Sequence, residues 1–362
     1  MRKVLRGLLA QIYLNLHRLF LRRRIVHFSQ ILGEPKEVLI RLPNAPGEIL
    51  FATPTLKRIR KNYGESRIFL LLPKDRRFIL RENPWYEGVI LEDERMLPFS
   101  PSFFRWKSHL RRQGFDLYID LCERDALLGR LLSLASGAKV RMVRGEGSPF
   151  FNCEIHVRED HRNEVEKHLS LVSAFLPESK EREEGIPLFL SEKRERSVRD
   201  FFRFQGVKNG ERLIGVDTFR WNPLHLLPLL REFENHLQGR ILFLDSGRAF
   251  HPEDQHVGKR KNAFLEGIKE GWVKDPILLP SHLKLDGPEI IQSCCLFITQ
   301  KTDYFSLAYA SGCPTILFLK GSESRYFQPP AKVSLKTILM DRRGGFPIAN
   351  MIEWAKEQLH KR

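Results

Sequence analysis

Short apolar runs alternate along most of this chain with longer segments in which apolar residues recur every three or four positions. The short runs have the length of buried strands, and the longer segments have the period of amphipathic helices. Strands are expected at 38–42, 67–72, 88–91, 115–121, 139–143, 213–216, 240–244, 276–279, 296–299 and, as the last strand, 315–319. Helices are expected at 49–62, 102–113, 126–136, 163–175, 192–204, 223–237, 263–271 and 305–311, and residues 287–292 form a further segment before the strand at 296–299. This alternation predicts the α/β class, with parallel sheets covered by helices on both faces.

The alternation stops between about residue 163 and residue 211 and then restarts. That stretch holds two helices around a charged run at 178–185, as a connection between domains does. At 362 residues the chain is long enough for two domains, each with its own hydrophobic core. We therefore predict an N-terminal domain at 37–180, a C-terminal domain at 186–345 and a closing helix at 346–362.

The first 30 residues follow a different pattern, that of a basic amphipathic helix. Apolar residues recur at helical spacing on one face, at Val4, Leu5, Leu8, Leu9, Ile12, Leu16, Leu19 and Phe20. Basic residues complement them at Arg2, Lys3, Arg6, Arg18, Arg22, Arg23 and Arg24. A helix of this kind at residues 1–24 suits the surface of a membrane rich in anionic lipid. A helix packed on the protein's own surface is the alternative interpretation.

This segment is a poor candidate for a membrane span or a secretion signal. Gln11, Asn15, His17 and Arg18 interrupt the apolar run well before the roughly 20 residues that a span needs. A small-residue cleavage site after a clean apolar core is also lacking. We expect the helix to lie on the bilayer.

The net charge of the chain favours acidic binding partners but does not identify one. The chain has 60 Lys and Arg residues against 44 Asp and Glu residues, a formal charge of +16. Such an excess favours phosphate, nucleotides, nucleic acid or anionic lipid. The sequence lacks a helix-turn-helix, an RNP motif and an aromatic-basic platform, so we expect no nucleic-acid partner. No GxGxxG follows the first strand, which argues against a dinucleotide-dependent dehydrogenase.

Neither cysteine nor histidine follows a metal-binding pattern. The five cysteines are an odd number without a CxxC pair, and most lie in apolar runs. This usage is typical of reduced core thiols in a cytosolic protein. His156, His161 and His168 lie near Glu154 and Glu164 in the sequence, but their spacing matches no metal motif. No metal site is predicted.

Four segments carry a more specific signal. Residues 41–56 read RLPNAPGEILFATPTL, and Asn83-Pro84 precede the third strand. Residues 115–121 read FDLYIDL, and residues 308–316 read AYASGCPTI. In this order they resemble glycosyltransferase family 9, the lipopolysaccharide heptosyltransferases, whose patterns are RLPNWxGD with a later TPAL, NP before a strand, FDLVIDL and AAALGVPTV. The resemblance spans about residues 37–330.

The resemblance implies a GT-B fold, with two Rossmann-like domains that face each other across a cleft. The N-terminal domain would hold the acceptor, and the C-terminal domain would hold the nucleotide-sugar. The implied reaction moves a heptose from ADP-heptose to the inner core of lipopolysaccharide, with inversion and without a metal or another cofactor. A lipid-linked acceptor also agrees with the basic N-terminal helix. We therefore expect a protein that is cytoplasmic and peripheral on the inner face of the cytoplasmic membrane.

In the first half, the resemblance directs attention to the loop after the first strand. Inverting transfer needs a base that takes the proton of the acceptor hydroxyl. The family has an aspartate at the position of Glu48, so the resemblance makes Glu48 the candidate base. Asn44 and Gly47 lie in the same loop, where a glycine lets the backbone approach a ligand closely. The alternative for Glu48 is a favourable charge in the first turn of a helix.

In the second half, residues 301–306 read KTDYFS where the family has D[ST]GxxH. Lys301 replaces the aspartate, Ser306 replaces the histidine, and only the hydroxyl residue, Thr302, is retained. The start of this helix could still bind the donor phosphates, with Lys301 adding positive charge. Ordinary capping of the helix by Thr302 and Asp303 is the alternative.

A second donor segment follows the strand at 213–216, where the family has KxWP in a longer loop. Arg220 would take the role of the lysine, and Thr218 would offer a hydroxyl. An exposed arginine on an interdomain loop is the alternative. Because donor residues are substituted, two functions stay open. One is an active glycosyltransferase with a nucleotide-sugar donor, ADP-linked by resemblance. The other is a catalytically degenerate member that binds glycolipid or partner enzymes without turnover.

Overall fold

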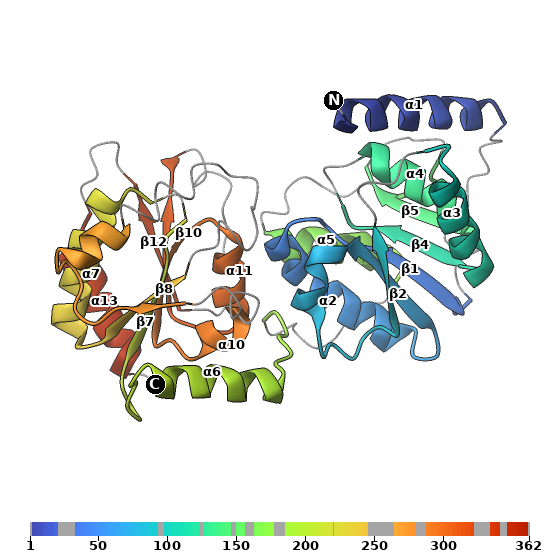
Figure 1. The fold of residues 1–362 in the computed structure, drawn as a ribbon. Helices are drawn as coiled ribbons and strands as arrows, with labels where there is room; N and C mark the ends of the chain where they lie inside the picture. The colour runs from blue at the N-terminus through green and yellow to red at the C-terminus, as the bar shows by residue number, and fades with distance from the viewer. Residues whose placement is uncertain are drawn as a thin grey trace. The chain divides into compact units, whose positions relative to one another are not determined.

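The computed structural model describes residues 2–20, 33–92, 98–122, 126–145, 150–155, 163–176, 185–219, 221–244, 264–279, 287–321, 334–340 and 346–360. The chain forms two compact units, Met1–Glu183 and Glu184–Arg362. Each unit is built around a six-stranded sheet whose neighbouring strands are all parallel, with helices on both faces (Figure 1).

The sheet of the first unit has the strand order β3-β2-β1-β4-β5-β6. Its strands are β1 (Glu37–Arg41), β2 (Arg67–Pro73), β3 (Gly88–Glu92), β4 (Leu117–Asp120), β5 (Val140–Arg144) and β6 (Cys153–Ile155). The central strand is apolar on both faces because helices cover both, and Val38, Leu39 and Ile40 are fully buried. In register, Ile40 of β1 lies beside Leu70 of β2 and Ile119 of β4.

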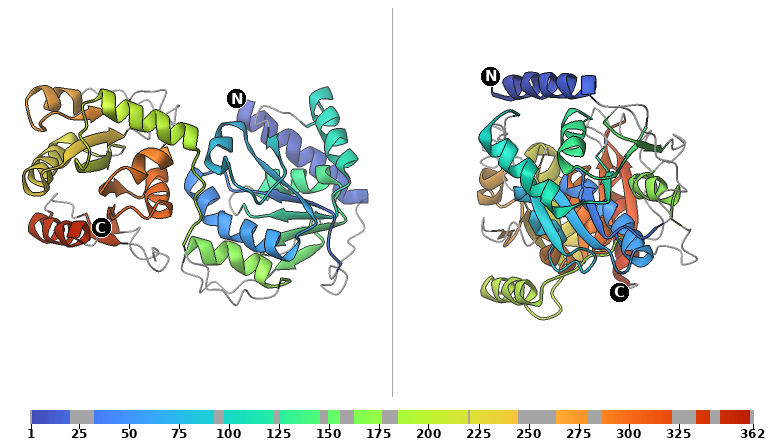
Figure 2. Two further views of the ribbon diagram at one scale, coloured as in Figure 1. Left: turned by 90° about the horizontal axis from the view of Figure 1, so that it is seen from below. Right: turned by 90° about the vertical axis from the view of Figure 1, so that its right-hand side faces the viewer.

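Helices cover the two faces of this sheet in separate groups (Figure 2). On one face, α2 (Pro46–Asn62) packs with α5 (Glu164–Ser173). The other face carries α1 (Arg2–Phe20), α3 (Pro101–Gln113) and α4 (Ala126–Ser136). A 3-10 helix, η2 (Lys74–Leu80), follows β2. Leu39, Leu71 and Tyr118 of the sheet share a core with Phe103 of α3 and Leu131 of α4, so the second face is well packed.

The sheet of the second unit has the order β12-β11-β10-β7-β8-β9. Its strands are β7 (Leu213–Asp217), β8 (Arg240–Leu244), β9 (Ile277–Leu278), β10 (Leu296–Gln300), β11 (Thr315–Leu319) and β12 (Leu335–Leu339). Its helices include α6 (Glu192–Phe204), α7 (Pro223–Leu237), α10 (Gly287–Gln292), α11 (Asp303–Ala310) and α13 (Ile348–His360). A further helical segment covers residues 264–269.

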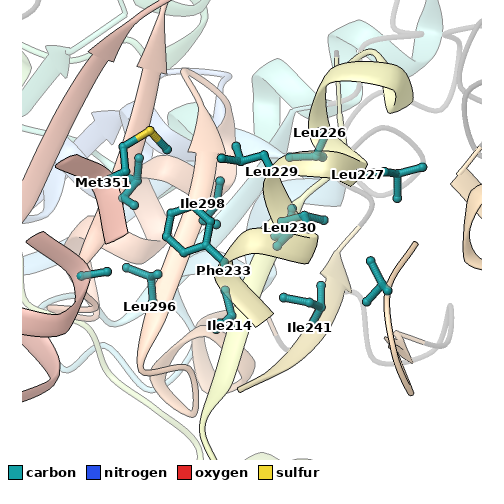
Figure 3. Close-up of a cluster of buried hydrophobic side chains, with 14 of the residues drawn as sticks. Ile214, Leu226, Leu227, Leu229, Leu230, Phe233, Ile241, Leu296, Ile298 and Met351 are labelled. Atoms are coloured by element: carbon teal, nitrogen blue, oxygen red, sulfur yellow. The ribbon is translucent and has the colours of Figure 1, made fainter. Parts of the chain in front are cut away.

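The core of the second unit lies between its sheet and the pair α7 and α13 (Figure 3). Phe233 of α7 is fully buried and shares one cluster with Ile214 of β7 and Ile298 of β10. Met351 of α13 belongs to the same cluster and is also fully buried. The closing helix expected at 346–362 is therefore part of the packing of this unit.

Two edge strands depart from the sequence prediction. The expectation that 315–319 is the last strand is wrong, because β12 follows it and pairs in parallel with β11. Only Ile338 of β12 is buried, so this edge strand lacks a clear apolar run. The other edge strand, β6, escapes prediction because three residues are too few to show a period.

The N-terminal helix, α1, packs on the first unit through Tyr13 and Leu14, which are buried. The apolar face singled out from the sequence is not the buried face, since Leu8 and Leu19 are 58% and 79% exposed. No helix in the described part of the chain is long and apolar enough to cross a membrane. The rest of the expected segment, from residue 21 to residue 30, lies outside the described residues.

His168 on α5 makes the stability of the first unit sensitive to acid. Burial lowers the pKa of its imidazole to about 4 from the ordinary 6.5; Glu164 opposes this shift, and Arg144 and Lys167 add to it. The folded state therefore favours the neutral ring, and this contribution is lost as the pH falls from about 6.5 to about 4. We expect a loss of about 3 kcal/mol in the free energy of unfolding between about pH 7 and about pH 4 from this group.

His168→Gln removes the titrating ring and should flatten this fall by the same amount. Urea unfolding of both proteins at the two pH values measures the difference. Identical losses in the wild type and the variant would mean that His168 does not enter the folded state as a neutral group.

Candidate functional site

Ligand sites of parallel α/β sheets form at the carboxyl ends of the strands, where the strand order reverses. In the first unit this point lies between β1 and β4, because the chain runs from β1 to β2 and β3 and then returns to the other side. In the second unit it lies between β7 and β10. The residues singled out from the sequence follow β1, β7 and β10, so each unit carries its candidates at such a point.

The loop from β1 to α2 holds the three acceptor candidates. Helix α2 begins at Pro46, and proline is favoured in the first turn of a helix. Ala45 occupies the N-cap position and has no side-chain group that could cap the helix. Gly47 is buried and Glu48 is partly buried in that first turn. A carboxylate at this place is stabilised by the helix dipole, so the geometry fits both interpretations of Glu48.

Asn44 of this loop is partly buried, and its Oδ1 atom lies inside without a hydrogen-bond partner among the described residues. Buried side-chain oxygens nearly always accept a hydrogen bond. A hydroxyl of a bound molecule would satisfy this atom.

A buried ion cluster that sequence reasoning missed lies at the same edge of the sheet. Arg41, the last residue of β1, is fully buried. Its Nε atom donates to Glu92 at the end of β3 over 3.1 Å, and its Nη1 atom donates to Asp120 at the end of β4 over 3.3 Å. The hydroxyl of Tyr118 donates to Asp120 over 3.2 Å, and the backbone N–H of Cys122 donates to the same carboxylate over 2.9 Å.

Burial acts on the ionisable groups of this cluster. Burial raises the pKa of Asp120, and the neighbouring guanidinium of Arg41 acts against that rise. Burial and the Asp120 carboxylate raise the pKa of Tyr118, so its hydroxyl stays a donor. The cluster therefore ties the ends of β1, β3 and β4 together directly before the loop that carries Glu48. In the sequence, this cluster is signalled by a charged residue at the end of each of these three strands.

One donor candidate of the second unit, Thr302, bonds to a buried carboxylate that sequence reasoning also missed. Asp217, the last residue of β7, is fully buried. It accepts hydrogen bonds from the hydroxyl of Thr302 over 2.5 Å, the hydroxyl of Thr299 over 3.3 Å and the backbone N–H of Phe219 over 3.0 Å. Thr302 occupies the N-cap position of α11, but its side chain does not cap the helix. Its hydroxyl instead donates to Asp217 at the end of β7.

The remaining donor candidates that the structure describes lie in different environments. Lys301 is exposed at the start of α11, and Ser306 is buried within that helix. Thr218 donates its hydroxyl to the carbonyl oxygen of Leu244 over 3.2 Å, which joins the ends of β7 and β8. Arg220 lies outside the described residues. Thr218, Lys301 and Thr302 thus share one edge of the second sheet.

Trp221, which follows Arg220, belongs to the hydrophobic core. Its ring is 3% exposed and meets Phe318 edge to face at 4.8 Å between centroids. The ring of Phe346 meets the Trp221 ring edge to face, at 6.1 Å between centroids. The described residues hold no group of three or more His, Cys, Asp or Glu side chains arranged to bind a metal ion.

Two six-stranded parallel sheets with helices on both faces, in two consecutive units, form the GT-B fold, so the expected fold class is confirmed. At the level of sequence, no protein-family model and no curated protein matches the chain. Solved structures match in fold, and those of glycosyltransferase family 9 and its heptosyltransferases are among them. The resemblance stated from the sequence is thereby confirmed at the level of fold.

Three of these structures each align with 90% of this chain. A glycosyltransferase family 9 protein from Veillonella parvula has a TM-score of 0.75 and 14% identity, over 90% of this chain and 98% of that chain. ADP-heptose LPS heptosyltransferase II from E. coli has a TM-score of 0.69 and 15% identity, over 90% and 99%. The E. coli heptosyltransferase WaaC with ADP-2-deoxy-2-fluoro heptose has a TM-score of 0.60 and 16% identity, over 90% and 99%.

Proposed function

We propose that this chain is a glycosyltransferase that moves a sugar from a nucleotide-sugar to a lipid-linked glycan. The observation that carries the proposal is the match to nearly complete structures of glycosyltransferase family 9 over 90% of this chain. A fold hosts more than one function, so the argument for activity depends on the sites. The carboxylate of Glu48 in the first turn of α2 is the feature that suits the chemistry.

Heptose from an ADP-linked donor is the proposed sugar, and the inner core of lipopolysaccharide or a related glycolipid is the proposed acceptor. WaaC, one of the structural neighbours, is solved with ADP and with an ADP-linked fluoroheptose. Transfer proceeds with inversion and without a metal in this proposal. Glu48 takes the proton from the acceptor hydroxyl as the oxygen bonds to the anomeric carbon. The bond from that carbon to the diphosphate breaks in the same step, and the nucleoside diphosphate leaves with its electron pair. Asn44 accepts a hydrogen bond from an acceptor hydroxyl, and Gly47 lets the acceptor approach the backbone.

The donor diphosphate lies at the start of α11 in this proposal. Lys301 is an exposed cation at that position, and the positive end of a helix dipole favours an anion. Thr218 and Arg220, which follow β7 in the sequence, are the other proposed contacts of the phosphates. Thr302 and Ser306 shape the site from within the protein, because one hydroxyl is bonded to Asp217 and the other is buried.

A second candidate function is a family member that binds glycolipid or partner enzymes without turnover. The observation that favours it is the charge at the start of α11. Asp303 adds a carboxylate in the first turn, and the hydroxyl of Thr302 is held by the buried carboxylate of Asp217. Negative charge there weakens the attraction of a helix N-terminus for diphosphate.

Donor binding separates the two functions. We expect saturable calorimetric binding of one nucleotide-sugar among ADP-heptose, UDP-sugars and GDP-sugars, with ADP as a fragment control. Lys301→Ala should weaken that binding about tenfold, because a charge-assisted contact to phosphate contributes on the order of 1.5 kcal/mol. Lys356→Ala, which removes an exposed lysine from α13, should leave it unchanged.

Unchanged affinity in Lys301→Ala would remove Lys301 from the donor site. Absence of binding to every nucleotide-sugar by the wild-type protein would favour the function without turnover.

A further inference from the structure

Helix α1 is fixed to the first unit by one narrow face. Ala10, Tyr13 and Leu14 are buried at 4%, 2% and 1% exposure. The ring of Tyr13 meets Phe103 of α3 edge to face at 5.3 Å, and Lys107 of α3 donates to the Tyr13 hydroxyl over 2.6 Å. The helix also packs along α4 (Figure 1). Its orientation on the unit is therefore set by specific contacts.

The opposite face of α1 presents a row of large apolar side chains to solvent. They are Val4 (77% exposed), Leu5 (48%), Leu8 (58%), Ile12 (42%), Leu16 (48%) and Leu19 (79%). At 3.6 residues per turn these positions form one continuous stripe along the helix. Soluble proteins seldom leave a contiguous apolar surface of this kind without a partner.

Two large aromatic side chains at the start of α3 are also exposed. Phe99, just before α3, is 41% exposed, and Phe104 on α3 is 45% exposed. The backbone of Phe99 has φ 69°, a left-handed conformation that costs a bulky residue free energy. The Phe99 ring contacts Tyr13 of α1 edge to face at 5.2 Å. The six exposed residues of α1 together with Phe99 and Phe104 are called the α1–α3 surface below.

The two helices that carry the α1–α3 surface are basic. Neither α1 nor α3 contains an aspartate or a glutamate, and each contains four Lys or Arg residues. The whole chain has 44 acidic residues in 362, so 32 residues of average composition would hold about four. Arg18 on α1 and Arg105, Arg111 and Arg112 on α3 are exposed. An apolar stripe on basic helices with exposed aromatic side chains matches the interface of an anionic bilayer.

We propose that the α1–α3 surface binds an anionic lipid bilayer, with α1 lying in the plane of the interface. The apolar stripe enters the boundary between headgroups and acyl chains, and the arginines of both helices bind lipid phosphates. A second copy of this chain is a poorer occupant, because a two-fold contact would bring the basic helices of both copies together. The proposal does not depend on catalysis, although it would hold the enzyme at a lipid-linked acceptor.

The test is flotation of the full chain with vesicles of phosphatidylcholine alone and of phosphatidylcholine mixed equally with phosphatidylglycerol. We expect strong binding to the anionic vesicles only, weakened by high salt. The double variant Leu8→Asp, Ile12→Asp should lose at least about 100-fold in binding, because two exposed apolar side chains no longer enter the bilayer. Phe104→Ser should lose about tenfold.

The matched control is Gln11→Asp, Asn15→Asp, which adds the same charge to α1 without removing an apolar side chain. Gln11 and Asn15 are exposed, so neither double variant disturbs the packed face. The control should lose much less binding than the stripe variant, and both should keep the wild-type circular dichroism spectrum and melting temperature. Equal losses in the two variants, or equal binding to neutral and anionic vesicles, would overturn the proposal. So would a dimer that dissociates in the stripe variant, together with no vesicle binding by the wild type.

Discussion

Replacing Glu48 by glutamine should lower the rate of sugar transfer by about 10²–10⁴-fold, with donor affinity unchanged. Glutamine keeps the size of the side chain and its hydrogen-bonding reach, but it cannot take a proton from the acceptor hydroxyl. The donor is held in the other unit in the proposed mechanism, so its binding does not require the carboxylate. Single-turnover transfer and calorimetric donor binding, measured on the same preparations, give the two quantities.

Glu48→Asp is the matched control for this prediction. It keeps the carboxylate and restores the residue type of the family, with a side chain one methylene shorter. We expect it to retain transfer well above that of Glu48→Gln, with any loss arising from altered reach. Wild-type turnover in Glu48→Gln would reduce the role of Glu48 to a charge at the start of α2, worth about 0.3–1 kcal/mol in stability.

Arg41→Met should destabilise the first unit by about 3–5 kcal/mol, the largest stability effect that we expect from one substitution. Methionine is similar in length but leaves the carboxylates of Asp120 and Glu92 buried without their cation. Urea unfolding followed by circular dichroism measures the loss. Combining Arg41→Met with Asp120→Asn and Glu92→Gln should recover part of it, because uncompensated buried charge is then removed. A loss in Arg41→Met below about 1 kcal/mol would mean that water or rearrangement already compensates the carboxylates.

Gly129 of α4 offers an independent test of the same ion cluster, and Gly7 of α1 is its control. A Cβ atom on Gly129 of α4 would clash with the Asp120 carboxylate and stand 3.0 Å from Nη1 of Arg41. A Cβ atom on Gly7 of α1 would meet nothing within 4 Å. Gly129→Ala should therefore cost about 1–3 kcal/mol, whereas Gly7→Ala should stabilise its helix by about 0.5–1 kcal/mol. Equal effects would contradict the close approach of α4 to the cluster.

Much of the fold could be predicted because the central strands of both sheets are buried on both faces. Runs such as 38–40 and 296–298 are apolar without interruption, and helices with a clear period lie between them. The edge strands β6 and β12 could not be predicted in this way. Edge strands pack on fewer neighbours, so their residues need not be uniformly apolar.

In the candidate site, too, some features could be predicted from the sequence and others could not. The motif around Glu48 is contiguous in the sequence, and so is the helix start at Lys301. The partners of the buried charges are distant in the sequence: Arg41 and Asp120 are 79 residues apart, and Asp217 and Thr302 are 85 residues apart. They meet because β1 lies beside β4 and β7 lies beside β10.

The sequence by itself determined the α/β class, the division into two βαβ halves, the contiguous loop motifs and the apolar stripe of the N-terminal helix. These features follow from periodicity and local composition, which depend only on neighbouring residues. The tertiary structure alone decided that Tyr13 and Leu14 pack inward while the stripe stays exposed, and that Thr302 donates to Asp217. Burial and hydrogen bonding between distant segments depend on strand order and helix placement, and the parallel sheets set both.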